Sequence, residues 1–323
     1  MSLKNIIGQD KVINFLIASI NNDMFASSYL FIGPDGVGKT LVAKEFAKLL
    51  NCETASLDAC DICNSCMKIN KNIHPDVHVV EKDGSDIKID NIRQLERDIH
   101  LKPFEARKKV FIVKDAHFMN AEAANALLKT LEEPPKDSII ILTTSYPHRI
   151  FSTIASRCRK VYFSSIDIEK LSSILENDFH LGKADSHYLS YFTEGRLGKA
   201  VALKEKEILG EKNMIIDDFI NSENLRQNFF DLDAKNKDDI RYNLDILMTW
   251  FRDIMLLKCG IDTASLVNSD RRKELLDLKN EYKMEDLLKI MHRILDTYTM
   301  LDYNINPKFS LEFLRTKTWE KHR

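Results

Sequence analysis

Short apolar runs alternate with longer amphipathic stretches along the first half of the chain. The runs are mostly continuous, as expected for strands that are buried on both faces of a parallel sheet. They lie at residues 29–32, 76–80, 110–113, 139–143 and 160–163. Since helical patterns separate them, the sequence predicts an α/β domain with a parallel five-stranded sheet flanked by helices.

Two of the helices between these strands have clear boundaries in the sequence. The first follows residue 38, and its apolar stripe at helical spacing consists of Val42, Phe46, Leu49 and Leu50. The second is predicted for residues 121–133, between Asn120 as the N-cap and Pro134, which cannot continue a helix. The predicted inner face of this second helix consists of Ala124, Leu127, Leu128 and Leu131.

Strand patterns stop after about residue 165, and helical patterns continue from there. The sequence therefore predicts an α/β domain over 1–165, a small helical domain over 166–207 and a larger helical domain over 208–323. In the last of these, apolar residues keep helical spacing over 244–255 and 287–295. Such stripes suit either a helical core or a surface that packs on another subunit.

The charge balance limits what such a protein can do by itself. The 323 residues carry a formal net charge of −2, and the pI is about 6.5. Nucleic-acid binding by a single chain usually needs a basic bias, because neutralised phosphates supply much of the affinity. The composition therefore argues against autonomous DNA binding and leaves a share in a composite site open.

The hydropathy pattern bears on the compartment. No apolar run approaches the ~18 residues that a membrane span requires. The first residues, MSLKNIIGQDK, lack the basic start, apolar run and cleavage site of a signal peptide. A cytoplasmic protein without membrane contact is predicted.

The segment GPDGVGKT, residues 33–40, matches the phosphate-loop pattern G-x-x-x-x-G-K-[ST] at every fixed position. A predicted strand precedes it and a predicted helix follows, which is the context that such a loop requires. Its glycines would let backbone N–H groups face the phosphates of ATP or ADP, while Lys39 would neutralise them and Thr40 would bind Mg²⁺. The predicted nucleotide-binding residues are Gly33, Gly36, Gly38, Lys39 and Thr40. A glycine-rich turn without a ligand is the alternative.

Hydrolysis needs a carboxylate on Mg²⁺ in addition to this loop. That acid should follow the strand at 110–113, but Lys114 stands there and Asp115 comes next. A lysine repels Mg²⁺, and a one-residue shift would turn the Asp115 side chain to the opposite face of the strand. The sequence therefore predicts a loop that can hold a nucleotide, with weak or absent hydrolysis.

Four of the six cysteines lie within fifteen residues, at Cys52, Cys60, Cys63 and Cys66. Four thiolates can complete a closed tetrahedral zinc site, and two successive C-x-x-C steps suit the tight turns that bring sulfurs to one ion. A catalytic zinc would usually keep an open position, so structural Zn²⁺ is predicted; free or redox-active cysteines are the alternative. The cluster forms an insertion over 52–66, between the first helix and the second strand and away from the phosphate loop.

Further motifs stand at 124–135 (ANALLKTLEEPP), 156–158 (SRC), 74–76 (HPD) and 6–12 (IIGQDKV). With the phosphate loop and the cysteine cluster, they resemble the clamp-loader subunits of the AAA+ class, and among these the delta-prime subunits of bacterial DNA polymerase III. The resemblance covers most of the first 205 residues and, more loosely, the helical remainder. It implies an AAA+ domain, a helical lid domain and an all-helical C-terminal collar.

In that family the arginine of SRC contacts the γ-phosphate bound by a neighbouring subunit, and Arg157 holds this position here. The resemblance therefore implies an arginine finger that acts in trans; an ordinary surface arginine is the alternative. Motor subunits of the family carry an Asp-Glu pair where this chain has Lys114 and Asp115. They also carry a sensor arginine where this chain has Gly198.

Together these features imply a subunit that helps to load the sliding clamp onto DNA by completing a neighbour's ATP site. The implied partners are the gamma/tau and delta subunits in a hetero-pentamer, with the clamp and primer-template DNA reached through the complex. No polymerase site is expected, because the spaced metal-binding acids of nucleotidyl transfer are missing. An active motor subunit of the gamma/tau type and a nucleotide-sensing scaffold without catalytic effect are the alternatives.

Overall fold

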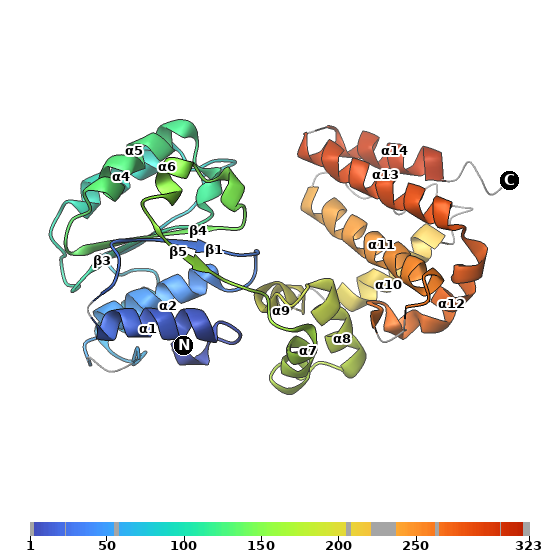
Figure 1. Ribbon diagram of the computed structural model, residues 1–323, viewed down its shortest axis with the longest axis horizontal. Coiled ribbons are helices and arrows are strands. Elements are labelled where there is room, and N and C mark those ends of the chain that lie inside the picture. Colours follow the sequence, from blue (N-terminus) through green and yellow to red (C-terminus); the bar gives the residue numbers. More distant parts are fainter. Residues whose placement is uncertain are drawn as a thin grey trace. The chain divides into compact units, whose positions relative to one another are not determined.

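A computed structural model describes residues 3–22, 24–54, 58–204, 208–220, 237–261, 265–303 and 305–318 (Figure 1). The contacts between residues divide the chain into two compact units. The first comprises Met1–Ile166 together with Arg196–Lys199, and the second comprises Asp167–Gly195 together with Ala200–Arg323.

The first unit is built on a sheet of five parallel strands. These are β1 (Ser28–Ile32), β2 (Val77–Val80), β3 (Lys109–Val113), β4 (Ser138–Thr144) and β5 (Arg159–Tyr162). Their order in the sheet is β2-β3-β4-β1-β5, so that β1 lies between β4 and β5. Every residue of β1, β3 and β4 is buried, which explains why their sequences are continuous apolar runs instead of alternating ones. The predicted five-stranded parallel sheet is confirmed.

Helices cover both faces of this sheet (Figure 1). The helices of the first unit are α1 (Asp10–Asn21), α2 (Lys39–Asn51), α3 (Asn64–Asn70), α4 (Ile89–Ile99), α5 (Ala121–Glu132) and α6 (Ser152–Ala155). One apolar core contains residues of α1, α2 and the sheet, and a second contains residues of α4, α5, α6 and the opposite face. Single 3-10 turns occur at Leu3–Asn5, Ala116–Phe118, Pro147–Arg149 and, in the second unit, Ser269–Arg271.

The two helices with clear sequence boundaries form as predicted. The apolar stripe of α2 is buried at all four predicted positions. The Asn120 side chain accepts a hydrogen bond from the Ala123 backbone at 2.8 Å, which makes Asn120 the N-cap of α5. Of the predicted inner face of α5, Leu128 alone is half-buried, and it packs against the edge of the same core.

The described part of the second unit is helical. Its helices are α7 (Ile168–Asn177), α8 (Lys183–Phe192), the part of α9 (Leu197–Lys204) from Ala200 onward, α10 (Ile208–Ile220), α11 (Lys237–Lys258), α12 (Arg272–Glu281), α13 (Met284–Asp302) and α14 (Pro307–Thr318). Helix α11 packs against α10, α12 and α13, and it buries Trp250 and Phe251 completely. The division into 166–207 and 208–323 stays a prediction, and residues 205–207 at that boundary lie outside the described residues. Across the described ranges, no helix is both long enough and apolar enough to span a membrane.

Candidate functional site

The phosphate loop connects the end of β1 to the start of α2. Gly36 and Gly38 have φ angles of +80° and +94°, which only glycine adopts without strain, and Gly38 is the N-cap of α2. At Gly33, a Cβ atom would lie 2.6 Å from the Phe163 carbonyl oxygen. Thr40 is the second residue of α2, so its hydroxyl stands at the helix start where a phosphate would sit. The conformation of the loop therefore explains its glycines.

Lys39 is almost fully buried and its ammonium lies inside this loop. Its Nζ donates to the carbonyl oxygens of Gly33 and Pro34 at 2.8 and 2.7 Å, and to Ser145 Oγ at 3.0 Å. Burial lowers the pKa of Lys39, and the nearby carboxylates of Asp35 and Asp115 oppose that shift. The ammonium is thus held at the place where phosphate charge would be neutralised.

Gln9, the residue that directly precedes α1, supports the phosphate loop. The Gln9 side chain is buried, and its Nε2 donates to the carbonyl oxygens of Val37 at 3.3 Å and Ser164 at 2.7 Å. Gln9 belongs to the IIGQDKV segment, so this motif braces the phosphate loop against the end of β5.

The two residues that follow β3 are arranged differently from the sequence-based prediction. Lys114 points to the surface and pairs with Glu81, with 3.4 Å between the charged groups. Asp115 has φ +51° and ψ +52°, so strand geometry has already ended and the expected change of face does not apply. The charge of Asp115, which follows β3, opposes the lowering of the Lys39 pKa, so this acid is electrostatically coupled to the phosphate loop.

Gly198 contacts the phosphate loop through its backbone. Its N–H donates to the Gly36 carbonyl oxygen at 2.8 Å, and the segment Arg196–Lys199 belongs to the first unit. A Cβ atom at position 198 would lie 2.7 Å from that oxygen. A sensor arginine therefore does not fit at this position in the observed backbone.

Arg157 lies in the short loop between α6 and β5, which is an edge strand of the sheet. Its Nη1 donates to the Thr153 carbonyl oxygen at 2.8 Å, and its Nη2 pairs with Glu132 Oε1 at 2.6 Å. The side chain is 35% exposed. Within the described residues its hydrogen bonds are to these two groups and not to the chain's own phosphate loop. The guanidinium is therefore ordered and accessible from outside.

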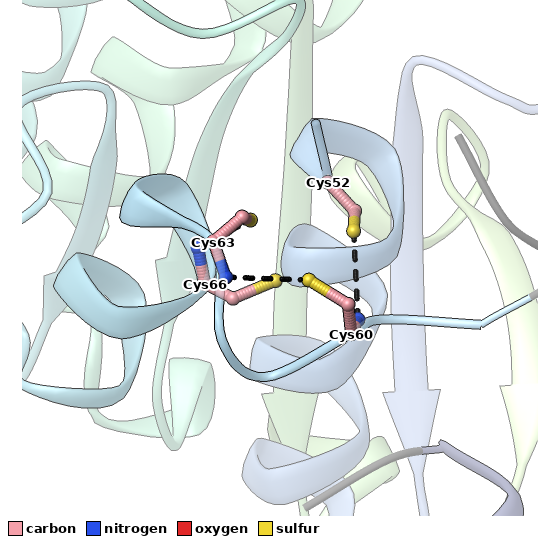
Figure 2. A group of neighbouring side chains, drawn as sticks. All are labelled: Cys52, Cys60, Cys63 and Cys66. Carbon is pink, nitrogen blue, oxygen red and sulfur yellow. Dashed lines mark hydrogen bonds between the residues drawn. The ribbon is translucent and has the colours of Figure 1, made fainter. Parts of the chain in front are cut away.

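The four cysteines come together as the sequence predicts (Figure 2). Their sulfur atoms all lie within 4.8 Å of one another, close to the ~3.8 Å edge of a tetrahedron with metal–sulfur bonds of ~2.3 Å. Backbone N–H groups of Cys60, Cys63 and Cys66 donate to the sulfurs of Cys52, Cys60 and Cys63 at 3.5, 3.3 and 3.4 Å. The arrangement fits a metal ion, and its all-thiolate donor set suits Zn²⁺.

The pKa values of two of these thiols shift in opposite directions. Backbone N–H groups of Cys63 and Ile62 lower the pKa of Cys60 to about 6. Burial raises the pKa of Cys66, and the neighbouring thiols add to that effect. Because closely spaced thiolates repel one another, all four can ionise together only around a positive charge.

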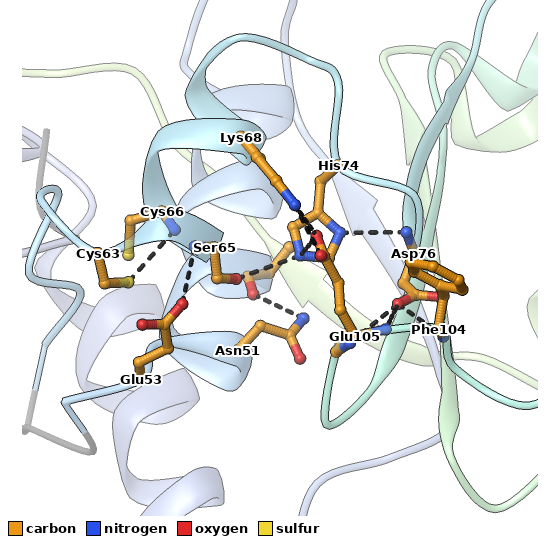
Figure 3. Close-up of polar contacts among 12 residues, drawn as sticks. Asn51, Glu53, Cys63, Ser65, Cys66, Lys68, His74, Asp76, Phe104 and Glu105 are labelled. Atoms are coloured by element: carbon orange, nitrogen blue, oxygen red, sulfur yellow. Dashed lines mark hydrogen bonds and ion pairs between the residues drawn. The ribbon is translucent and has the colours of Figure 1, made fainter.

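A polar cluster attaches the segment that carries the four cysteines, called the cysteine module below, to the sheet (Figure 3). His74 is buried, and its Nδ1 accepts from the Asp76 backbone at 3.1 Å while its Nε2 lies 3.3 Å from Ser65 Oγ. Glu105 also faces Nε2, at 3.6 Å. Since Nδ1 is an acceptor, the proton of the neutral ring is on Nε2. Nε2 therefore cannot accept the hydroxyl proton of Ser65. The Ser–His–Glu grouping is therefore a structural brace and not a hydrolytic triad.

Asp76 fixes the loop opposite this brace. Its buried carboxylate accepts backbone hydrogen bonds from Phe104, Glu105 and Ala106 at 2.8 to 3.0 Å. Burial alone would raise the pKa of Asp76, but the N–H groups of Glu105, Phe104 and Ala106 outweigh it and hold the pKa below its ordinary value. The HPD motif thus joins the cysteine module, β2 and the 104–106 loop.

Asp76→Ala is expected to lower the free energy of unfolding by about 2–3 kcal/mol at neutral pH, because it removes several hydrogen bonds to a buried charge. Since the folded pKa of Asp76 is depressed, its contribution is complete above the unfolded pKa of ~3.9 and is lost as pH falls through the folded pKa. Urea unfolding of the variant and the wild type between pH 3 and 7 measures this difference. Asp83→Ala is the control, because its pair with Lys88 is exposed and is worth well under ~1 kcal/mol. Equal losses in both variants would contradict the assignment.

Sequence reasoning missed some of the residues that position this site. Ser145 has no predicted role in the sequence analysis, and yet its hydroxyl accepts a hydrogen bond from Lys39. Glu132 has no sequence signal beyond its place in the ANALLKTLEEPP motif, since its partner Arg157 lies 25 residues away. Only knowledge of the packing of α5 on α6 could have paired them.

Comparisons with known proteins agree with these features. A model of "DNA polymerase III, delta subunit" matches residues 8–167, and one of "DNA polymerase III, delta subunit, C terminal" matches residues 212–315. DNA polymerase III subunit delta' of Bacillus subtilis is 29% identical over 318 residues, which are 95% of this chain and 94% of that protein. Subunit tau of the same organism is 39% identical over 164 residues, which are 50% of this chain and only 29% of tau.

Among solved structures, a DNA polymerase III gamma subunit-related protein of Thermotoga maritima aligns with a TM-score of 0.45 at 19% identity, over 98% of this chain and all of that one. The family models and the full-length relative give the assignment. The chain belongs to the delta-prime family of DNA polymerase III clamp-loader subunits.

Proposed function

We propose that this clamp-loader subunit completes the ATP site of a neighbouring subunit with Arg157 and so helps to load the sliding clamp onto DNA. The observation that carries the proposal is the state of Arg157. Its guanidinium is held by two groups of its own chain, is partly exposed, and makes no hydrogen bond to its own phosphate loop within the described residues.

The chemistry of phosphoryl transfer explains why such an arginine matters. In the transition state, negative charge spreads over the oxygens of the transferred phosphoryl group, and an arginine from outside stabilises it. A guanidinium offers planar, paired N–H donors that match phosphate oxygens. Partners of the kind expected are the gamma/tau and delta subunits, in a pentamer that reaches the clamp and primer-template DNA.

The chain's own phosphate loop has a different proposed role. Its glycines, Lys39 and Thr40 suit the binding of ATP or ADP with Mg²⁺, but Lys114 and Gly198 replace two groups that a motor subunit uses. We infer that nucleotide is held here with little or no turnover. The four-cysteine site is proposed to hold one structural Zn²⁺ away from this chemistry.

An active motor subunit is the second candidate, and one observation favours it. Asp115 interacts electrostatically with Lys39 in spite of its shifted position. A carboxylate there could serve Mg²⁺ if the loop adjusted around a bound nucleotide.

The isolated chain is expected to hydrolyse ATP no faster than its Lys39→Ala variant, since the chain lacks a second acid and a sensor arginine. Steady-state release of phosphate in the presence of Mg²⁺ measures this rate, and the variant gives the background. Turnover that is clearly above the background and is lost in Lys39→Ala would favour the motor-subunit candidate and assign the metal to Asp115.

A further inference from the structure

We propose that Glu132 is a positioning residue for Arg157, which sets the plane of the guanidinium before it meets a neighbour's phosphate. The proposal rests on the trans role of Arg157 proposed above. It starts from the two contacts that hold the side chain, one on each terminal nitrogen: Thr153 carbonyl oxygen to Nη1 and Glu132 Oε1 to Nη2.

Two anchors on different nitrogens fix more than the position of the charge. One contact alone would let the guanidinium rotate about its own axis, whereas two contacts define its plane. A long arginine side chain otherwise samples many rotamers, and ordering it in advance removes that cost from the reaction. Glu132 therefore gives the arginine an orientation.

The contacts leave the arginine able to bind a phosphate. A guanidinium has five N–H groups, and the two bonds to Glu132 and Thr153 use two of them, which leaves three without a partner in the described part of the chain. Two N–H groups are enough for a bidentate phosphate contact. Glu132 and the phosphate can thus be bound at the same time.

Glu132 stands on a rigid support. It is the last residue of α5, and Pro134 and Pro135 follow after one further residue, so the helix cannot continue past this point. Both side chains of the pair are partly exposed, at 35% for Arg157 and 51% for Glu132. Solvent screens the carboxylate from an approaching phosphate, so that its negative charge does not block the contact.

The test uses the complete clamp loader, reconstituted with clamp and primer-template DNA, and measures kcat and KM for ATP. Glu132→Ala is expected to lower kcat by about 10- to 100-fold, as misplaced catalytic groups do, with KM changed less than about twofold. Glu132→Gln keeps an acceptor oxygen and should recover most of the rate. Glu133→Ala is the matched control, because Glu133 is the adjacent exposed acid, and it should match the wild type.

The double variant Glu132→Ala/Arg157→Ala separates positioning from other effects. If Glu132 acts through Arg157, the double variant is no slower than Arg157→Ala alone. A further loss in the double variant, or a wild-type rate in Glu132→Ala while Arg157→Ala is slow, would overturn the positioning role and leave the finger intact. A wild-type rate in Arg157→Ala would overturn both proposals.

Discussion

A clamp loader that carries Arg157→Ala in this chain is expected to hydrolyse ATP about 10³-fold more slowly, or slower still, at the neighbouring site that this arginine completes. The reason is electrostatic: the variant removes a positive charge from the place where the transferred phosphoryl group gains negative charge in the transition state. Binding of ATP by the neighbour should change far less, since the arginine acts mainly in the transition state.

The measurement is the rate of ATP hydrolysis by the reconstituted complex with clamp and primer-template DNA. In the most direct form, the other motor subunits carry alanine at their phosphate-loop lysines, so that only the site next to this chain turns over. Arg157→Lys is the informative companion, because lysine keeps the charge but not the paired donors and should recover little. Normal turnover with Arg157→Ala would contradict the finger role and favour a nucleotide-sensing scaffold.

Removal of the metal from the four-cysteine site is expected to have the second large effect. Structural zinc contributes about 10–16 kcal/mol of apparent binding free energy in small peptides, so chelation should open the module locally. The ion pair between Lys48 and Asp61, at 2.5 Å, ties the module to α2, and the His74 brace ties it to the start of β2. The sheet itself should stay folded. Hydrogen exchange is therefore expected to rise over residues 58–70 and to change little in β1, β3 and β4.

Metal analysis of the purified chain provides the control for this experiment. One zinc ion per chain is expected, and Cys63→Ser should lower that content sharply. Cys259→Ser should not change it, because Cys259 is an exposed cysteine outside the cluster. A chain that carries no metal as purified, or whose hydrogen exchange does not change when a chelator is added, would show that the cysteines serve another purpose.

The sheet could be predicted from sequence because its strands are buried on both faces. Under that condition the apolar runs themselves mark the strands, and β1, β3 and β4 contain no exposed residue. The phosphate loop and the cysteine cluster could be predicted equally well, since each is a local pattern whose spacing has a chemical reason. Local chemistry is what a single sequence reports best.

The contacts that tune the site could not be predicted, because they join residues that are distant in sequence. Nothing local to Gly198 indicates that its backbone meets Gly36, and nothing local to Glu132 indicates Arg157. The face of Asp115 was misjudged for a different reason. The two-residue alternation of a strand was carried one step past its end, into a left-handed turn.

The central claim is that this subunit acts outward, on a neighbour's nucleotide, and not on its own. The most direct measurement compares two variants of this chain in the same reconstituted complex: Arg157→Ala, which removes the outward group, and Lys39→Ala, which disables the chain's own phosphate loop. We predict that Arg157→Ala removes turnover at the neighbouring site, while the complex with Lys39→Ala hydrolyses ATP at nearly the wild-type rate. The opposite result, a large loss with Lys39→Ala and none with Arg157→Ala, would contradict it and identify the chain as a motor subunit.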